Sequence, residues 1–220
     1  NLKFKKIIHF IRDPYEQAIS NFNYHLLEPT PEKWFLLIDN DTNKWFSNTK
    51  LLKLLFNVLE LDYDLVELCK KYLKDNFQPK KDKSYYKNLL KLKNENKKSA
   101  LIIETLRFIF ETKHILKMAC IIKLNKKNRE KFLYLKIKDF KSFRLDKTIS
   151  KINKFVFSKE NIDSKKIIDK YNDSYESMKN GVHISNHKKE EKEKLSKFLH
   201  NNIYIRLIFN KIIGIIEKYV

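Results

Sequence analysis

Arg12 and Ser20 are the residues whose types and spacing most directly suggest chemistry. Arg12 follows the apolar run Ile7–Ile11, whose length and β-branched content predict a buried strand. Asp13 then predicts a helix start as N-cap, with proline at the first helical position and Glu16 placed to complete a capping box. A guanidinium at the strand end, the free first amides of the helix and the Ser20 hydroxyl could together bind an anion.

The same stretch also has a purely structural interpretation. A strand, a capped turn and an amphipathic helix occur in α/β proteins that bind no anion at this place. Ala18, Ile19, Phe22 and Leu26 recur at helical spacing and would give the helix a face to bury. The spacing alone therefore leaves open both a phosphate site and a structural unit.

The run Arg12-Asp13-Pro14, with Ser20 eight residues after Arg12, resembles the 3′-phosphate-binding motif of sulfotransferases that use 3′-phosphoadenosine 5′-phosphosulfate (PAPS). Further segments resemble protist and algal sulfotransferase-domain proteins: Tyr24-His25, 29–34 (PTPEKW), Ile103-Glu104 with Arg107, Met118-Ala119 and 133–140 (LYLKIKDF). The resemblance implies that Arg12 and Ser20 hold the 3′-phosphate of the nucleotide.

The resemblance also implies a fold: a small parallel sheet flanked by many helices, of the α/β class and related to P-loop kinases. A second strand is expected from Phe132 to Ile137, parallel to the first, and Asp139 after it is expected to pin nearby backbone amides. In the late loop His183 and Ser185 match positions that contact the 3′-phosphate, although the Lys/Arg-Gly core of better-known members is missing. The alternative for this loop is a plain connection between helices.

The chain starts at Asn1 and has only two glycines, Gly181 and Gly214, so it contains no Gly-rich phosphate loop. In the family such a loop lies upstream of the Arg12 motif. We therefore expect residues 1–220 to be a single sulfotransferase-like domain that lacks its N-terminal strand, loop and helix. The compartment, cytoplasm or Golgi lumen, would depend on that upstream segment.

The chain is strongly basic, with 47 Lys+Arg against 27 Asp+Glu and a formal net charge of +20. The lysines are spread along the sequence, which favours a compositional bias over a dedicated polyanion site, with attraction of an anionic ligand as a by-product. Tyr85 and Tyr86 lie in the lysine-rich stretch 80–98 and could stack on nucleic-acid bases, but a solvated surface segment is the commoner case. Nucleic acid is not an expected partner.

Metal and thiol chemistry have little support in the sequence. Cys69 and Cys120 are isolated in apolar helical contexts, as expected for buried thiols, and the histidines lack zinc-ligand spacing. His114 is expected to be exposed rather than catalytic. No metal cofactor is therefore expected.

Apolar periodicity predicts helices over much of the remaining chain: 31–38, 44–59, 62 to about 73, a short one around Leu89, 99–124, 146–157, 164–178, 188–199 and 202–219. The 99–124 helix should be the longest, capped by Asn96 or Ser99. Glu104 and Arg107 share a face of it and are expected to form a surface ion pair; alternatively Glu104 is a base in an acceptor pocket. The last helix is too short and too charged to span a bilayer.

The resemblance to PAPS-dependent sulfotransferases implies transfer of a sulfuryl group from PAPS, as co-substrate, to an acceptor hydroxyl or amine, with carbohydrate one such acceptor class. No residue is assigned as the catalytic base. The alternative is a catalytically degenerate basic module that keeps the scaffold and binds an anionic glycan or nucleic acid.

Overall fold

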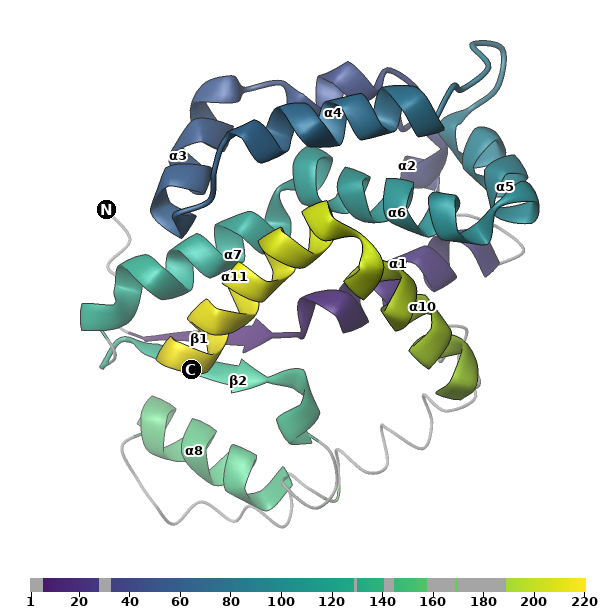
Figure 1. Cartoon of the computed structure of the whole chain (residues 1–220). Coiled ribbons are helices and arrows are strands. Elements are labelled where there is room, and N and C mark those ends of the chain that lie inside the picture. The colour runs from purple at the N-terminus through teal and green to yellow at the C-terminus, as the bar shows by residue number, and fades with distance from the viewer. Residues whose placement is uncertain (1–5, 28–32, 129, 141–144, 158–168, 170–188) are drawn as a thin grey trace. The chain divides into compact units, whose positions relative to one another are not determined.

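The computed structural model describes residues 6–27, 33–128, 130–140, 145–157, 169 and 189–220 (Figure 1). The chain divides into two compact units. The first comprises Asn1–Arg12, Leu124–Asn186 and Val220, and the second comprises Asp13–Lys123 and His187–Tyr219. The single-domain organisation stays a prediction. The helix expected over 164–178 lies outside the described residues.

The first unit contains a two-stranded sheet. Strand β1 (Ile7–Ile11) pairs in parallel with β2 (Phe132–Lys136), which confirms the expected strands and their direction. The expected burial of β1 is wrong, because only Ile11 is buried and Ile7 and Phe10 are exposed. Helix α8 (Leu145–Phe157) contacts β2 and buries Leu145 and Ile149. A helix-rich chain with a small parallel sheet agrees with the coarse α/β prediction.

Asp139 has the structural role expected of it. It lies in a short 3₁₀ helix, Ile137–Phe140, directly after β2. Its Oδ2 accepts a hydrogen bond from the Lys136 amide at 3.3 Å, and its carbonyl accepts one from the Thr148 hydroxyl at 2.8 Å. Asp139 thereby joins the end of β2 to α8.

The second unit consists of helices packed around α6 (Lys97–Arg107), which contacts α1, α4, α5, α10 and α11. Every residue from Ala100 to Phe110 is buried, so α6 is the centre of this core. The surrounding helices are α1 (Pro14–Leu27), α2 (Lys33–Leu36), α3 (Thr49–Leu59), α4 (Asp64–Asn76), α5 (Tyr85–Glu95), α7 (His114–Leu124), α10 (Lys189–Asn201) and α11 (Ile203–Tyr219).

Polar side chains begin several of these helices, as their sequences predict. Asp13 Oδ1 accepts hydrogen bonds from the Tyr15 and Glu16 amides at 2.9 and 3.0 Å. Asn96 Oδ1 accepts one from the Ser99 amide at 3.0 Å, so Asn96 is the N-cap of α6. These local caps explain why the helix starts were predictable.

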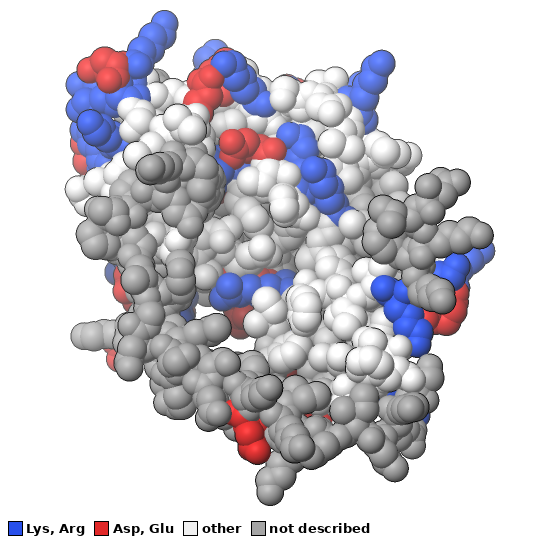
Figure 2. All heavy atoms as spheres, turned by 180° about the vertical axis from the view of Figure 1, so that it is seen from behind, with Lys and Arg blue, Asp and Glu red and all other residues white. Residues whose placement is uncertain are grey.

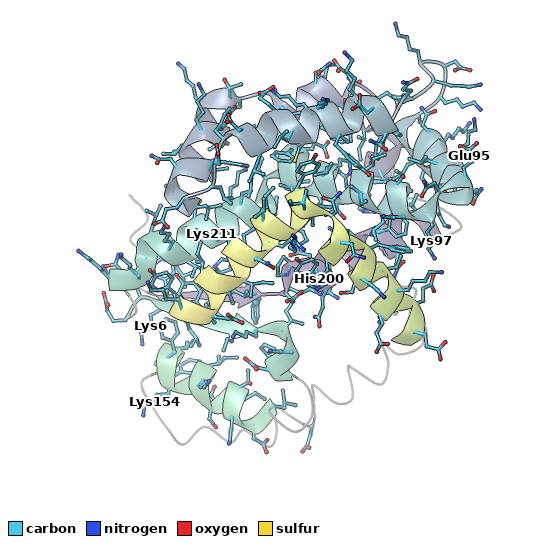
Figure 3. All side chains as sticks on the ribbon, viewed as in Figure 1. Lys6, Glu95, Lys97, Lys154, His200 and Lys211 are labelled. Atoms are coloured by element: carbon cyan, nitrogen blue, oxygen red, sulfur yellow. The ribbon has the colours of Figure 1, made fainter. Side chains whose placement is uncertain are left out.

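The start of α1 is also held by α10 and α11. The Tyr15 ring stacks on the His200 imidazole with centroids 3.8 Å apart, and its hydroxyl donates to Asn210 Oδ1 at 3.3 Å. Figure 3 labels His200 on α10. On the surface, Glu60 accepts hydrogen bonds from Lys123 and Lys211, which tie α3 to α7 and α11.

The prediction of one long helix over 99–124 is wrong. Helix α6 ends at Arg107, a π-helical turn covers Phe108–Thr112, and Lys113 adopts a left-handed conformation with φ 57° before α7 begins. The Lys113 ammonium donates to the carbonyls of Trp45, at 3.0 Å, and Phe110. Both helices bury apolar residues, so the periodicity continues across the break and does not reveal it.

Three other boundaries differ from the sequence prediction. The 44–59 segment contains a separate 3₁₀ helix, Thr42–Phe46, and α3 starts only after Asn48, whose φ is 61°. Helix α2 is a single turn, whereas α5 is longer than expected. Within the described part of the chain, no helix has the length and apolar character needed to cross a membrane.

Replacing Asn96 with alanine should lower the free energy of unfolding by about 1 kcal/mol, because the Ser99 amide loses its acceptor. Urea denaturation followed by circular dichroism measures the change. Asn96→Asp, which keeps a carboxylate oxygen at this place, is the control and should stay within a few tenths of a kcal/mol of the unchanged chain. Equal losses in both variants would contradict the capping role.

Candidate functional site

The structure describes two of the four residues predicted to bind the nucleotide, Arg12 and Ser20, and they belong to different units. Arg12 follows β1 at the end of the first unit's leading segment and is half-buried. Ser20 lies on α1 in the second unit and is also half-buried. His183 and Ser185 lie outside the described residues. Because Arg12 and Ser20 belong to different units, a phosphate site shared by them stays a prediction.

Within the first unit, Arg12 lies at the carboxyl edge of the parallel strand pair. The register places Ile11 opposite Lys136, so both strands end together, one followed by Arg12 and the other ending in Lys136. Arg12 forms no hydrogen bond or ion pair with the described residues of its own unit. This edge therefore carries two cationic side chains, Arg12 and Lys136. The described residues of the first unit do not use the guanidinium donors of Arg12.

The first amides of α1 are not free, contrary to the sequence expectation. Asp13 Oδ1 already accepts from the Tyr15 and Glu16 amides, and the Asp13 carbonyl accepts from the Gln17 amide at 2.9 Å. Pro14 has no amide hydrogen to donate. An anion near this helix start must therefore be held by side chains, and the Asp13 carboxylate opposes its charge.

A buried polar cluster lies at the centre of the second unit. We call His25, Tyr85, Glu104, Arg107 and Glu111 the Glu104 cluster. The two oxygens of the Glu104 carboxylate each accept two hydrogen bonds. Oε1 accepts from His25 Nδ1 at 2.9 Å and Arg107 Nη2 at 2.6 Å, and Oε2 accepts from the Tyr85 hydroxyl at 2.9 Å and Arg107 Nε at 2.8 Å.

Aromatic rings and a second carboxylate complete the surroundings of Arg107. The guanidinium lies over the Phe35 ring, 5.4 Å from its centroid, and the His25 imidazole stacks on the same ring at 4.2 Å. Arg107 Nη1 also donates to Glu111, which sits in the π-helical turn. The guanidinium also lies over the Tyr85 ring, 5.9 Å from its centroid, so the charge of Arg107 is shared between two carboxylates and two aromatic faces.

The electrostatics of the cluster follow from burial and pairing. Burial alone raises the pKa of the Glu104 carboxyl, but the charge and hydrogen bonds of Arg107 and His25 outweigh it and lower this pKa to about 2. Burial, together with the negative charge of Glu104, raises the pKa of the Tyr85 hydroxyl well above its ordinary value. Glu104 is therefore ionised and Tyr85 neutral near neutral pH.

These observations correct the expectations for Glu104 and Arg107. Their side chains are each 1% exposed, so they form a buried ion pair and not a surface one. A carboxylate with all its acceptor positions occupied and a low pKa is also a poor proton acceptor. Glu104 therefore has the geometry of a structural residue, and the alternative of a catalytic base loses its support.

The exposure of four other candidate residues decides which roles they can have. Tyr85 is fully buried, which excludes it from stacking on nucleic-acid bases, while His114 is exposed as predicted. Cys69 and Cys120 are free and buried, as predicted, and burial raises the pKa of their thiols to about 12 and about 11. Both thiols therefore stay protonated at neutral pH.

The surface charge is dispersed. Figure 2 shows lysine and arginine side chains spread over one face of the molecule with acidic side chains among them. Among the residues that the structure describes, no group of three or more His, Cys, Asp or Glu side chains could hold a metal ion.

Comparison of the chain with protein-family models, curated proteins and solved structures finds no significant match.

Replacing Glu104 with glutamine should lower the free energy of unfolding by about 3–5 kcal/mol, because the buried guanidinium of Arg107 loses its closest counter-charge. Urea denaturation measures the loss. Glu95→Gln, at the end of α5 (Figure 3), is the matched control. This glutamate pairs with Lys91 on the surface at 3.4 Å, and its replacement should cost less than about 0.5 kcal/mol. A similar small loss in both variants would show that the buried pair contributes little.

The same carboxylate should make stability depend on pH in the acid range. The pKa of Glu104 falls from 4.5 to about 2 on folding. The stabilisation that its ionised carboxylate adds to the free energy of unfolding is therefore complete above pH 4.5 and is lost as the pH falls toward 2. The difference in unfolding free energy between the unchanged chain and Glu104→Gln should shrink over this interval. A difference that stays constant from pH 5 to the lowest pH at which both proteins remain folded would contradict this assignment.

Proposed function

We propose that this chain is a PAPS-dependent sulfotransferase domain whose small parallel sheet belongs to a P-loop-kinase-like fold. The observation that carries the proposal is the position of Arg12 at the carboxyl edge of the parallel strand pair. In α/β proteins with parallel sheets, ligands bind outside the carboxyl ends of the strands. Arg12 has the planar donor geometry that a phosphate accepts in bidentate fashion.

The capped start of α1 changes how this site would work. Since Asp13 occupies the Tyr15 and Glu16 amides, the 3′-phosphate is held by side chains, with Arg12 as the main cation and the Ser20 hydroxyl as a neutral donor. Lys136 at the end of the neighbouring strand adds positive charge to the edge. Arg12 therefore carries most of the affinity for the 3′-phosphate.

The reaction is the in-line transfer of a sulfuryl group from PAPS to an acceptor hydroxyl or amine. The acceptor loses its proton to a base, the new bond to sulfur forms, and the bond between sulfur and the 5′-phosphate oxygen breaks, leaving adenosine 3′,5′-bisphosphate. Binding of the remote 3′-phosphate at Arg12 positions the reacting end of the nucleotide without taking part in the transfer.

A second candidate function is the catalytically degenerate basic module, and one observation favours it. Lys81, Lys87 and Lys91 are exposed on α5 and the turn before it. The buried side chain of Asn88 fastens this turn through the backbone of Lys80, with bonds of 3.1 and 3.0 Å. Lys87 and Lys91 lie four positions apart on one side of α5, and exposed lysines of this kind suit a polyanion such as a sulfated polysaccharide.

Replacing Arg12 with alanine should lower the affinity for adenosine 3′,5′-bisphosphate at least tenfold, because a charge-assisted contact to phosphate is lost. Isothermal titration calorimetry measures the affinity, with adenosine 5′-monophosphate as the second ligand. The unchanged chain should prefer the bisphosphate, and the variant should bind both nucleotides alike.

Lys131→Ala is the matched control, since Lys131 is an exposed cation at the opposite, amino end of β2. This variant should keep the preference for the bisphosphate. An unchanged chain that binds the two nucleotides equally, while retaining a sulfated polysaccharide at moderate salt, would refute the enzyme assignment and favour the basic module.

A further inference from the structure

Asn23 is an unusual residue of α1. Its side chain is 1% exposed, yet neither Nδ2 nor Oδ1 has a hydrogen-bond partner among the residues that the structure describes. Buried polar side chains are nearly always hydrogen-bonded, and leaving one unpaired costs about 1–3 kcal/mol. Phe22 and Leu26, which flank it on α1, are ordinary core residues. An apolar side chain at position 23 would thus suit the fold better.

The chemistry of the amide restricts what can pair with it. Nδ2 offers two donors and Oδ1 is an acceptor, and both atoms lack a partner. Phosphate, sulfate or carboxylate groups offer only acceptors and would leave Oδ1 unpaired. The edge of adenine carries an amine donor beside a ring-nitrogen acceptor, and asparagine pairs with that edge through both of its atoms.

The position of Asn23 relates it to Ser20. Both residues lie on α1, three positions apart, so they share a side of the helix with Cβ atoms about 5–6 Å from each other. A single nucleotide spans such a separation between its sugar phosphate and its base. Ser20 is half-buried and its hydroxyl has no hydrogen-bond partner among the described residues of the second unit, whereas Asn23 lies deeper.

We propose that Asn23 recognises the adenine base of the nucleotide whose phosphate is bound at Ser20. The inference rests on the proposed function, which supplies the nucleotide. The Asn23 carboxamide accepts a hydrogen bond from the exocyclic amine and donates one to the adjacent ring nitrogen. Since Asn23 is covered in the ligand-free chain, the side chains over it move when the base enters.

The proposal is tested by measuring the affinities of two ligands, which differ only in the exocyclic amine, for the unchanged chain and for a variant at position 23. The ligands are adenosine 3′,5′-bisphosphate and purine riboside 3′,5′-bisphosphate, which lacks the exocyclic amine and would leave Oδ1 unpaired. By calorimetry the unchanged chain should bind the adenosine compound about tenfold more tightly. Asn23→Leu, similar in size and apolar, should bind both ligands equally and unfold at an unchanged or higher temperature.

Asn21→Leu is the matched control, because Asn21 is a half-buried asparagine of the same helix on another side. It should keep the preference for adenosine. If the unchanged chain binds both ligands equally, or if Asn23→Leu keeps the preference, the inference is wrong while the proposed function stands.

If the unchanged chain binds neither ligand, the proposed function and this inference fall together. The comparison of the two ligands on the unchanged chain requires no substitution. Equal binding therefore overturns the inference even if Asn23→Leu does not fold, and Asn23→Ser is then the second variant that must lose the preference.

Discussion

The ion pair between Glu104 and Arg107 is the constraint on which the second unit depends. Two opposite charges with almost no exposure to water are stable only when their remaining donors and acceptors are satisfied. His25 on α1, Tyr85 on α5 and Glu111 in the π-helical turn meet this requirement. The pair therefore fixes the positions of α1 and α5 against α6 more narrowly than apolar contacts would, because hydrogen bonds require defined distances and angles.

The π-helical turn after α6 is held by the same arginine. Arg107 reaches Glu104 within α6 and Glu111 one turn beyond it, so the guanidinium lies where the helix changes its pitch. Lys113 then ends the turn in a left-handed conformation and donates to backbone carbonyls at the break. The interruption is thus held by polar contacts that a continuous α-helix would not need. Residues of this type in the middle of an apolar segment serve the fold and require no catalytic explanation.

The proposed nucleotide site contrasts with this cluster. The Glu104 carboxylate accepts four hydrogen bonds, whereas Arg12 in its unit, and Ser20 and Asn23 in theirs, have no hydrogen-bond partner among the described residues there. Groups without partners in the folded chain are the ones available to a ligand. This difference is why a structural role is assigned to Glu104 and a binding role is proposed for Arg12, Ser20 and Asn23.

The sequence by itself determined the features that depend on near neighbours. The strand before Arg12, the cap at Asp13 and the cap at Asn96 follow from apolar runs and side chains that bond to amides two or three residues away. Only the tertiary structure decided that Glu104 and Arg107 are buried, that the helix breaks at Lys113 and that Asn23 has no hydrogen-bond partner within the described part of the chain. The reason is physical: burial and pairing there depend on residues brought from distant segments, such as His25 and Tyr85 at Glu104, and local periodicity carries no information about them.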